Sequence, residues 1–201
     1  MTRWYAEKKR EHFYREAKRV GYRARSAFKL KHIQRKFEVI KDGDIVVDLG
    51  AAPGGWSQVA VDLVGAHGRV IGVDLLPIQP LPDAQFIQGD ITTSETVQQL
   101  KHLLKDTKAD VVLSDMSPDI SGTYSLDQAR SVWLSERALD VAKAVLKPRG
   151  NFVCKLFEGA DTHDFVETVN QSFYIVKRFS PSASRKASSE IYIIAKSFKN
   201  R

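Results

Sequence analysis

The sequence has few of the residues that build disulfide frameworks or structural metal sites. Its 201 residues include one cysteine, Cys154, and five histidines that are scattered along the chain. A single thiol excludes an internal disulfide framework and a cysteine-rich metal site, and the histidines lack metal-ligand spacing. We therefore expect a protein without a bound metal.

Long apolar stretches are also missing. No run of 18 apolar residues is long enough to cross a membrane, and the start, 1–4, lacks the apolar segment of a signal peptide. A length of 201 residues with 43% hydrophobic content is ordinary for one globular domain with one sizeable core. We expect a single domain over residues 1–201 in a soluble, cytoplasmic and monomeric protein.

The most informative motif is a glycine-rich turn, DLGAAPGGW, over residues 48–56. It follows the apolar run 45–47 and precedes an amphipathic segment, a pattern that predicts a strand, a turn and a helix start. Gly50, Gly54 and Gly55 lack a Cβ, so a ligand can approach the backbone closely, and the first helical turn offers unpaired N–H groups. The turn predicts a binding site for a nucleoside-bearing ligand. The alternative is a tight connection between strand and helix that binds no ligand.

Two common cofactor motifs do not fit this turn. A P-loop needs Lys and Ser or Thr after its last glycine, whereas Trp56 and Ser57 follow Gly55. The dinucleotide pattern G-x-G-x-x-G fails because Gly50 is followed by the sequence AAPG over 51–54. The spacing therefore disfavours a dehydrogenase.

Three further apolar segments are followed by an aspartate. The segments 69–73, 85–89 and 110–114 precede Asp74, Asp90 and Asp115. A single aspartate at a strand end is often a helix cap or a turn former, but parallel strands bring all their carboxyl ends to one edge. We expect Asp74 to accept hydrogen bonds from ribose hydroxyls and Asp90 to accept from an exocyclic amine.

The charge is unevenly distributed. Residues 1–41 carry a net charge of +10, residues 177–201 carry +6, and the middle carries −9. This asymmetry favours a polyanionic partner held by the basic N-terminal helical segment and the basic C-terminal segment, over basic faces kept for solubility. Aromatic residues in the N-terminal segment are able to stack on bases or to dock the segment on the domain. A helix is expected from an N-cap at Ser26 to Phe37.

The remaining pattern alternates between helices and strands. Helices are expected over 93–104, 126–146 and 161–172, and strands over 151–157, 174–179 and 190–196, with a polar basic loop at 180–189. Alternation of this kind predicts an α/β fold with a mainly parallel sheet and an antiparallel edge.

Lys155 interrupts the apolar strand NFVCKLF. A lysine within a buried strand is costly unless it is paired or functional, and burial beside a second cation lowers its pKa from about 10.4. Lys29 is the candidate second cation, and Asp115 and Glu190 are candidate orienting carboxylates for a lysine base. The alternative is a lysine that snorkels to solvent and pairs with Glu158 or Glu190.

Motifs along nearly the whole chain resemble one family. They are GYRARSAFKL, VVDLGAAPGGWSQVA, IGVDLLP, FIQGDIT, LSDMSPDISG, FVCKLFEG and SSEIYIIA. In this order they are similar to the FtsJ/RrmJ-type ribosomal RNA 2′-O-methyltransferases. The resemblance implies a class I S-adenosylmethionine-dependent methyltransferase fold, which is Rossmann-like with a seven-stranded, mainly parallel sheet. It also implies methylation of the ribose of a uridine in large-subunit ribosomal RNA.

The resemblance also assigns residues. It implies a catalytic tetrad of Lys29, Asp115, Lys155 and Glu190, and contacts to S-adenosylmethionine from Gly54, Trp56, Asp74, Asp90 and Asp115. Relatives with similar cores modify tRNA, and a non-catalytic RNA-binding protein with a vestigial fold is the other alternative. The intact tetrad disfavours the latter.

Rival methyl acceptors fit the residues poorly. Methylation at C5 of a pyrimidine needs a cysteine nucleophile, and strand alternation places Cys154 on the face opposite Lys155. Enzymes that methylate an exocyclic amine usually carry the motif Asp/Asn-Pro-Pro-aromatic after the fourth strand, whereas residues 115–118 of this chain read DMSP. Oxygen methylation remains.

Overall fold

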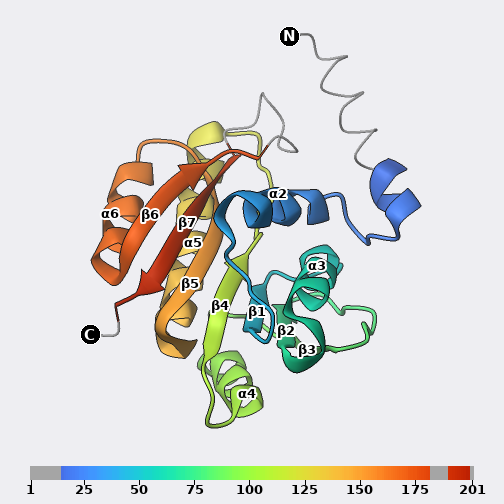
Figure 1. The fold of residues 1–201 in the computed structure, drawn as a ribbon. Helices are drawn as coiled ribbons and strands as arrows, with labels where there is room; N and C mark the ends of the chain where they lie inside the picture. Colours follow the sequence, from blue (N-terminus) through green and yellow to red (C-terminus); the bar gives the residue numbers. More distant parts are fainter. Residues whose placement is uncertain (1–14, 182–189, 200–201) are drawn as a thin grey trace.

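The computed structural model describes residues 15–181 and 190–199 of the chain. Seven strands in these ranges form one sheet in the order β3-β2-β1-β4-β5-β7-β6 (Figure 1). The strands are β1 (Ile45–Leu49), β2 (Arg69–Asp74), β3 (Ala84–Gln88), β4 (Ala109–Ser114), β5 (Leu146–Phe157), β6 (Phe173–Phe179) and β7 (Glu190–Phe198). β7 pairs antiparallel with both its neighbours, and the other pairs are parallel. The predicted α/β fold is confirmed, and the antiparallel strand lies one place inside the sheet edge, between β5 and β6.

Helices cover both faces of the sheet (Figure 1). They are α2 (Ala27–Phe37), α3 (Gly55–Val64), α4 (Ser94–Leu104), α5 (Tyr124–Val145) and α6 (Thr162–Ser172), with a short 3₁₀ turn at Gly65–His67. Buried side chains of α4, α5 and α6 share one core with the sheet, and those of α2 and α3 share the other. Residues 15–20 are also helical.

Strand alternation decides which residues face which helical layer. In β5, Phe152 and Cys154 belong to the core under α5, whereas Val153 belongs to the core under α2 and α3. Because side chains alternate along a strand, Lys155 is on the side of Val153. In β7, Tyr192 belongs to the same core as Val153. These strands therefore direct their polar side chains toward α2.

Most element boundaries lie within two residues of the expectations, and the largest difference is at the start of β5, which was expected at 151. Helix α2 begins after Ser26, as predicted, although the Ser26 side chain makes no capping hydrogen bond. The helix expected to end at Leu146 ends at Val145, and Leu146 opens β5. The pairing with β4 then shifts register, since Leu146 is opposite Ala109 and Asn151 is opposite Val111. The helix-breaking residues of 147–150 therefore interrupt a strand instead of forming a separate loop.

Parts of the two basic segments lie outside the described residues. These are 1–14 of the N-terminal segment, and 182–189 and 200–201 of the C-terminal segment, with most of the predicted loop 180–189 among them. In the described part of the chain, none of the helices combines the length and apolarity that a membrane span requires.

Candidate active site

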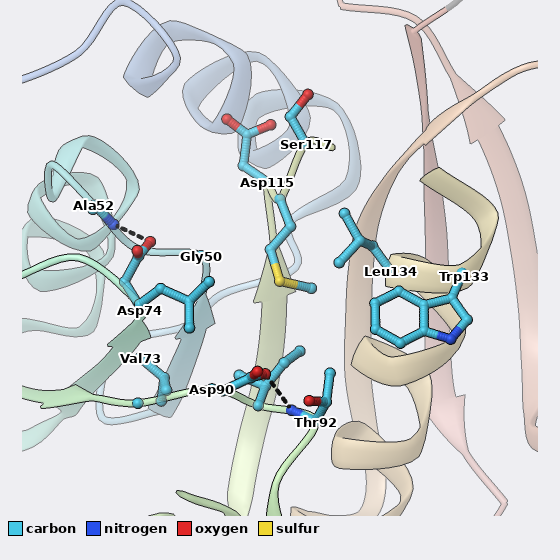
Figure 2. Close-up of a pocket in the computed structure, with 14 residues that line it drawn as sticks. Gly50, Ala52, Val73, Asp74, Asp90, Thr92, Asp115, Ser117, Trp133 and Leu134 are labelled. Carbon is cyan, nitrogen blue, oxygen red and sulfur yellow. Dashed lines mark hydrogen bonds between the residues drawn. The ribbon is translucent and has the colours of Figure 1, made fainter. Parts of the chain in front are cut away.

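A cavity of about 390 Å³ opens where the carboxyl ends of β1, β2 and β4 meet (Figure 2). We refer to it as the carboxylate cavity, because Asp74, Asp90 and Asp115 all line it. Its other lining residues are Gly50, Ala52, Val73, Leu75, Gly89, Ile91, Thr92, Met116, Ser117, Trp133 and Leu134. This lining, which lies wholly within the described residues, contains three acidic side chains and no lysine or arginine. The predicted convergence of the three aspartates at one sheet edge is thus present in the structure.

Asp74 joins the two loops beside the cavity. Its Oδ2 accepts a hydrogen bond from the Ala52 N–H at 2.9 Å, and its Oδ1 accepts from the Leu76 N–H at 2.8 Å. Asp90 is held in a similar way, because its Oδ1 accepts from the Thr92 N–H at 2.8 Å (Figure 2). Each carboxylate oxygen can accept more than one hydrogen bond, so both groups retain capacity for a ligand.

The opposite wall of the cavity is apolar. Trp133 and Leu134, from α5, lie across the cavity from Asp74 (Figure 2). Gly50 has a φ of +73°, and a Cβ there would overlap with the Met116 side chain. A side chain at position 50 would therefore be strained and would displace the wall. A slot with carboxylates on one side and apolar groups on the other suits a nucleoside.

Beside the cavity lies a group of five side chains that we call the lysine cluster. Its members are Lys29, Asp115, Lys155, Glu190 and Tyr192. The Lys155 Nζ donates to the main-chain oxygen of Asp115 at 2.5 Å and lies 3.3 Å from Asp115 Oδ1. Lys155 is only 7% exposed. The alternative of a solvent-directed lysine paired with Glu158 or Glu190 is not what the structure shows, because Lys155 is buried against Asp115.

The second lysine is paired within the same cluster. The Lys29 Nζ, from α2, lies 2.6 Å from Glu190 Oε1, and Lys29 is 8% exposed. It also lies 5.8 Å from the centroid of the Tyr192 ring. The cluster thus brings together side chains from α2, β5, β7 and the end of β4, including all four predicted tetrad residues.

Tyr192 connects the two halves of the lysine cluster. Its hydroxyl donates to Asp115 Oδ1 at 2.6 Å, and its ring stacks on Trp56 at a centroid separation of 5.7 Å. It lies opposite Lys155 in the β5–β7 pairing. Burial, with Asp115 and Glu190 nearby, raises the pKa of Tyr192 well above its ordinary value. The phenol therefore stays protonated and serves as a donor to Asp115.

The backbone around Lys155 is fixed from the other face of the sheet. The Ser135 hydroxyl, from α5, donates to the Lys155 main-chain oxygen at 2.9 Å. The Ser131 hydroxyl accepts from the Phe157 N–H at 3.0 Å. These contacts hold the strand at Lys155 and two residues after it. Cys154 is buried in the core beneath α5, which raises the pKa of its thiol and leaves it remote from the lysine cluster.

Asp48 is a fully buried carboxyl at the end of β1. Its Oδ2 accepts from the Ser57 hydroxyl at 2.7 Å, and its Oδ1 has no hydrogen-bond partner among the described residues. Burial raises the pKa of Asp48 to about 7, and repulsion from the Asp115 and Asp74 carboxylates acts in the same direction. The hydrogen bond from Ser57 lowers the pKa and offsets part of this rise. The acidic character of this sheet edge therefore extends beneath the cavity.

The family of the chain follows from comparison with known proteins. A family model for FtsJ-like methyltransferases matches residues 22–198. The chain belongs to this family. That match spans both the carboxylate cavity and the lysine cluster, and it confirms the resemblance drawn from the motifs.

Individual relatives of this FtsJ-like chain have related names. A protein of Marinobacter nauticus named Ribosomal RNA large subunit methyltransferase E is 48% identical over 198 residues, covering 98% of this chain and 96% of that protein. A protein of the same name from Methanosarcina acetivorans is 50% identical over 193 residues, covering 96% of this chain and 70% of that protein. A crystal structure described as a ribosomal RNA methyltransferase from Plasmodium falciparum has a TM-score of 0.81 at 28% identity, covering 90% of this chain and all of that chain.

Two predicted cofactor residues of this FtsJ-like chain do not line the cavity. Gly54 is the residue before α3 and Trp56 lies in its first turn, and both contact the segment 21–26. Trp56 is 2% exposed, and its indole N–H donates to the Ser26 main-chain oxygen at 2.8 Å. The Gly54 N–H already donates to the Ala51 main-chain oxygen at 2.6 Å, so this donor is not left over for a ligand. The assignment of Gly54 and Trp56 as cofactor contacts stays a prediction.

Reasoning from the residues did not single out Tyr192 or Trp133. Tyr192 follows Glu190 by two positions in a strand, and this period of two was the available signal that both share a face. Trp133 gave no comparable signal, because its place on the cavity wall depends on the packing of α5 against the sheet.

Proposed function

We propose that this chain transfers a methyl group from S-adenosylmethionine to the ribose 2′-hydroxyl of a uridine in large-subunit ribosomal RNA. The observation that carries the proposal is the buried Lys155 amine, held against Asp115 at the border of the carboxylate cavity. A buried amine beside a ligand pocket is the arrangement that proton transfer from a weakly acidic hydroxyl requires.

The residues of the cavity fit S-adenosylmethionine. This cofactor supplies a methyl group on a positively charged sulfur, and its nucleoside half carries a ribose and an adenine. Three carboxylates and no lysine or arginine line the described cavity, which favours a cation and disfavours a phosphate-bearing dinucleotide. Asp74 would hold the ribose hydroxyls, Asp90 the exocyclic amine, and Trp133 the face of the base. Trp56 would contribute its backbone N–H group, whereas the Gly54 N–H already donates to the Ala51 main-chain oxygen at 2.6 Å.

Lys155 would act as the base in this proposal. A ribose hydroxyl is a weak nucleophile, and its proton has to leave as the oxygen attacks. In its deprotonated form, the Lys155 Nζ would accept that proton. Asp115 orients the amine through its main-chain oxygen and its carboxylate, and Tyr192 holds that carboxylate in turn.

Lys29 and Glu190 would position the RNA. Their ion pair, with Nζ and Oε1 2.6 Å apart, lies beside the Tyr192 ring at the end of β7. A cation there would stabilise a phosphate or the developing negative charge on the ribose oxygen. Glu190 would fix the Lys29 amine or accept a hydrogen bond from the target ribose.

The ribosomal RNA substrate is supported by the names of the relatives and by the charge distribution. The proteins from Marinobacter nauticus and Methanosarcina acetivorans are both named as large-subunit methyltransferases. The basic segments 1–41 and 177–201 would bind the phosphate backbone, which supplies most of the affinity in such complexes. The large ribosomal subunit is the expected setting.

Mapping of ribose methylation by mass spectrometry tests this proposal directly. Ribosomal and transfer RNA from cells with and without the protein would be digested and compared. Loss of one 2′-O-methyluridine from large-subunit RNA is the expected result. Loss confined to transfer RNA, or no loss in either RNA, would contradict the proposed substrate.

Cofactor identity has a separate test. A ligand at 100 times its dissociation constant stabilises a protein by about 2.7 kcal/mol. S-adenosylhomocysteine, the demethylated product, should raise the melting temperature accordingly, and NAD should not. A shift with NAD alone would contradict the assignment of the cavity.

A further inference from the structure

The segment 21–26, which joins the N-terminal helix at 15–20 to α2, lies along the first turn of α3. Figure 1 shows α2 and the start of α3 on the same face of the sheet. The contacts pair Arg23 with Gly54, Ala24 with Gly55, Ser26 with Trp56, and both Gly21 and Arg23 with Gln58. The end of the glycine-rich turn, together with Gln58, therefore holds residues 21–26 of the basic N-terminal segment in place.

The two consecutive glycines make this approach possible. A Cβ on Gly54 would lie 2.9 Å from Arg23 Nη1, and one on Gly55 would lie 2.9 Å from the Ala24 Cβ. Real Cβ atoms do not come this close to other heavy atoms without displacement. In this structure the space above the glycine pair is therefore occupied by the chain itself. Gln58 adds two hydrogen bonds: its Oε1 accepts from the Arg23 N–H at 2.7 Å, and its Nε2 donates to the Gly21 main-chain oxygen at 3.1 Å.

The Arg23 side chain reaches beyond α3 to both loops beside the carboxylate cavity. Its Nη1 donates to the Gln79 oxygen at 2.6 Å and to the Pro53 oxygen at 3.4 Å, and its Nη2 donates to the Pro80 oxygen at 2.7 Å. Pro53 follows Ala52, and the loop that holds residues 79 and 80 begins with Leu75. Ala52 and Leu75 both line the cavity. One guanidinium thus ties the glycine-rich turn to the loop after β2.

The same segment is flanked by exposed cations. The side chain of Arg19 is 74% exposed on the N-terminal side, and Arg35 is exposed on α2. Arg23 differs from them because its guanidinium N–H groups are directed at three main-chain oxygens. Arg19 is paired with Glu16, Arg35 is suited to contact a phosphate, and Arg23 is suited to fix the position of this surface relative to the cavity.

We propose that Arg23 is a positioning residue that couples occupancy of the carboxylate cavity to RNA binding by the N-terminal basic segment. The proposal rests on the function proposed above, which places a nucleoside cofactor in the cavity and RNA on the basic surface. A ligand that orders the two loops also orders the three oxygens that hold Arg23. Because coupling between two sites is reciprocal, each ligand then increases affinity for the other.

The test measures affinity instead of activity. The dissociation constant of an in vitro transcribed large-subunit ribosomal RNA fragment would be determined with and without saturating S-adenosylhomocysteine, for the wild type, Arg23→Met and Arg35→Met. Calorimetry without RNA would give the affinity for S-adenosylhomocysteine. Methionine keeps an unbranched apolar stem and removes one positive charge in both variants, so Arg35→Met is the matched control.

The wild type should bind RNA about fivefold or more tightly when S-adenosylhomocysteine is present. In Arg23→Met this ratio should fall to about one, and the affinity for S-adenosylhomocysteine should weaken about tenfold, a loss of about 1.4 kcal/mol. Arg35→Met should weaken RNA binding under both conditions and keep the wild-type ratio. Gln58→Met, which removes the hydrogen bonds between residues 21–26 and α3, should also lower the ratio. This variant replaces Arg23→Met in the experiment if Arg23→Met does not fold.

Two results would overturn the inference: a wild-type ratio of one, or a wild-type ratio retained in Arg23→Met and Gln58→Met. If the wild type fails to bind S-adenosylhomocysteine at all, the proposed function is at fault. If it binds S-adenosylhomocysteine and RNA independently of one another, only the coupling through Arg23 is wrong.

Discussion

The carboxylate cavity and the lysine cluster lie side by side but are built from opposite chemistry. The cavity is formed by strand-end aspartates and loop backbone in the parallel half of the sheet, and no lysine or arginine is among its described lining residues. The cluster contains two buried lysines, each within 3.3 Å of a carboxylate oxygen. A cationic ligand is favoured in the first region, and proton transfer and phosphate contacts are favoured in the second.

Asp115 belongs to both regions. It lines the cavity, and its oxygens contact the Lys155 amine and the Tyr192 hydroxyl. One residue therefore fixes the position of the Lys155 amine relative to the carboxylate cavity. Under the proposed function, cofactor binding and proton transfer are divided between neighbouring sets of side chains, so a substitution in one set should impair one of these activities and leave the other measurable.

The largest effect is expected from Lys155→Met. Removal of a general base typically costs about 10²- to 10⁴-fold in rate, so turnover should fall by about a thousandfold. The affinity for S-adenosylhomocysteine, measured by calorimetry, should change by less than about threefold, because the amine is not part of the cavity lining. Lys147→Met is the matched control at the other end of β5, where Lys147 pairs with Asp110. Near-normal turnover in Lys155→Met would defeat the base assignment.

Asp48→Asn tests the buried acid beneath the cavity. Because the pKa of Asp48 is raised to about 7 from 3.8, the folded protein keeps a proton that the unfolded chain loses between these values. The free energy of unfolding should therefore fall as pH rises from about 4 to 7, by up to about 4 kcal/mol, and level off above. Asparagine cannot ionise, so the difference in melting temperature between pH 5 and pH 8 should shrink by several degrees in the variant. An unchanged difference would show that Asp48 is ionised throughout.

Asp74→Asn should separate binding from turnover. Both oxygens of Asp74 accept backbone N–H groups, and an asparagine offers one acceptor oxygen, so one of the two loop contacts is lost. The affinity for S-adenosylhomocysteine should weaken about tenfold to a hundredfold, while turnover at saturating cofactor stays near the wild-type value. Asp83→Asn, at the other end of the same loop, is the control. Loss of turnover without loss of affinity would place Asp74 in the chemistry instead.

The smallest effect is expected from Lys36→Gln on the exposed side of α2. The Lys36 Nζ lies 4.6 Å from the centroid of the Phe179 ring, and Lys36 is not among the residues that line the cavity. If Lys36 contacts a phosphate, RNA affinity should fall a few-fold and the slope of log affinity against log salt should decrease by about one. Affinity for S-adenosylhomocysteine should not change. A salt slope equal to that of the wild type would remove Lys36 from the RNA surface.

Local signals in the sequence predicted much of the fold. Apolar runs that end in aspartate located β2 and β4, because a buried strand and its polar end differ sharply in composition. Periodicity located α4 within one residue of its start at Ser94. The insertion of β7 between β5 and β6 was not predictable in the same way, because strand order depends on long-range pairing.

The site was predictable to a similar degree. The resemblance supplied the four tetrad residues, and the structure brings them together. Residue patterns alone suggested Lys155, because its charge interrupts an apolar strand. The residue patterns did not indicate that Arg23 lies over the glycine pair, because that contact joins segments about thirty residues apart. The contact also depends on main-chain oxygens, which every residue has and which the sequence therefore does not single out.

The position of β7 has a consequence for synthesis of the chain. Because β7 is the last strand yet lies inside the sheet, β6 has no hydrogen-bonded neighbour until β7 inserts beside it. Glu190 and Tyr192 arrive with that strand, when the aspartates at the ends of β2 and β4 have long been made. All residues that line the carboxylate cavity, up to Leu134, are therefore synthesised before β7 supplies the residues that complete the lysine cluster.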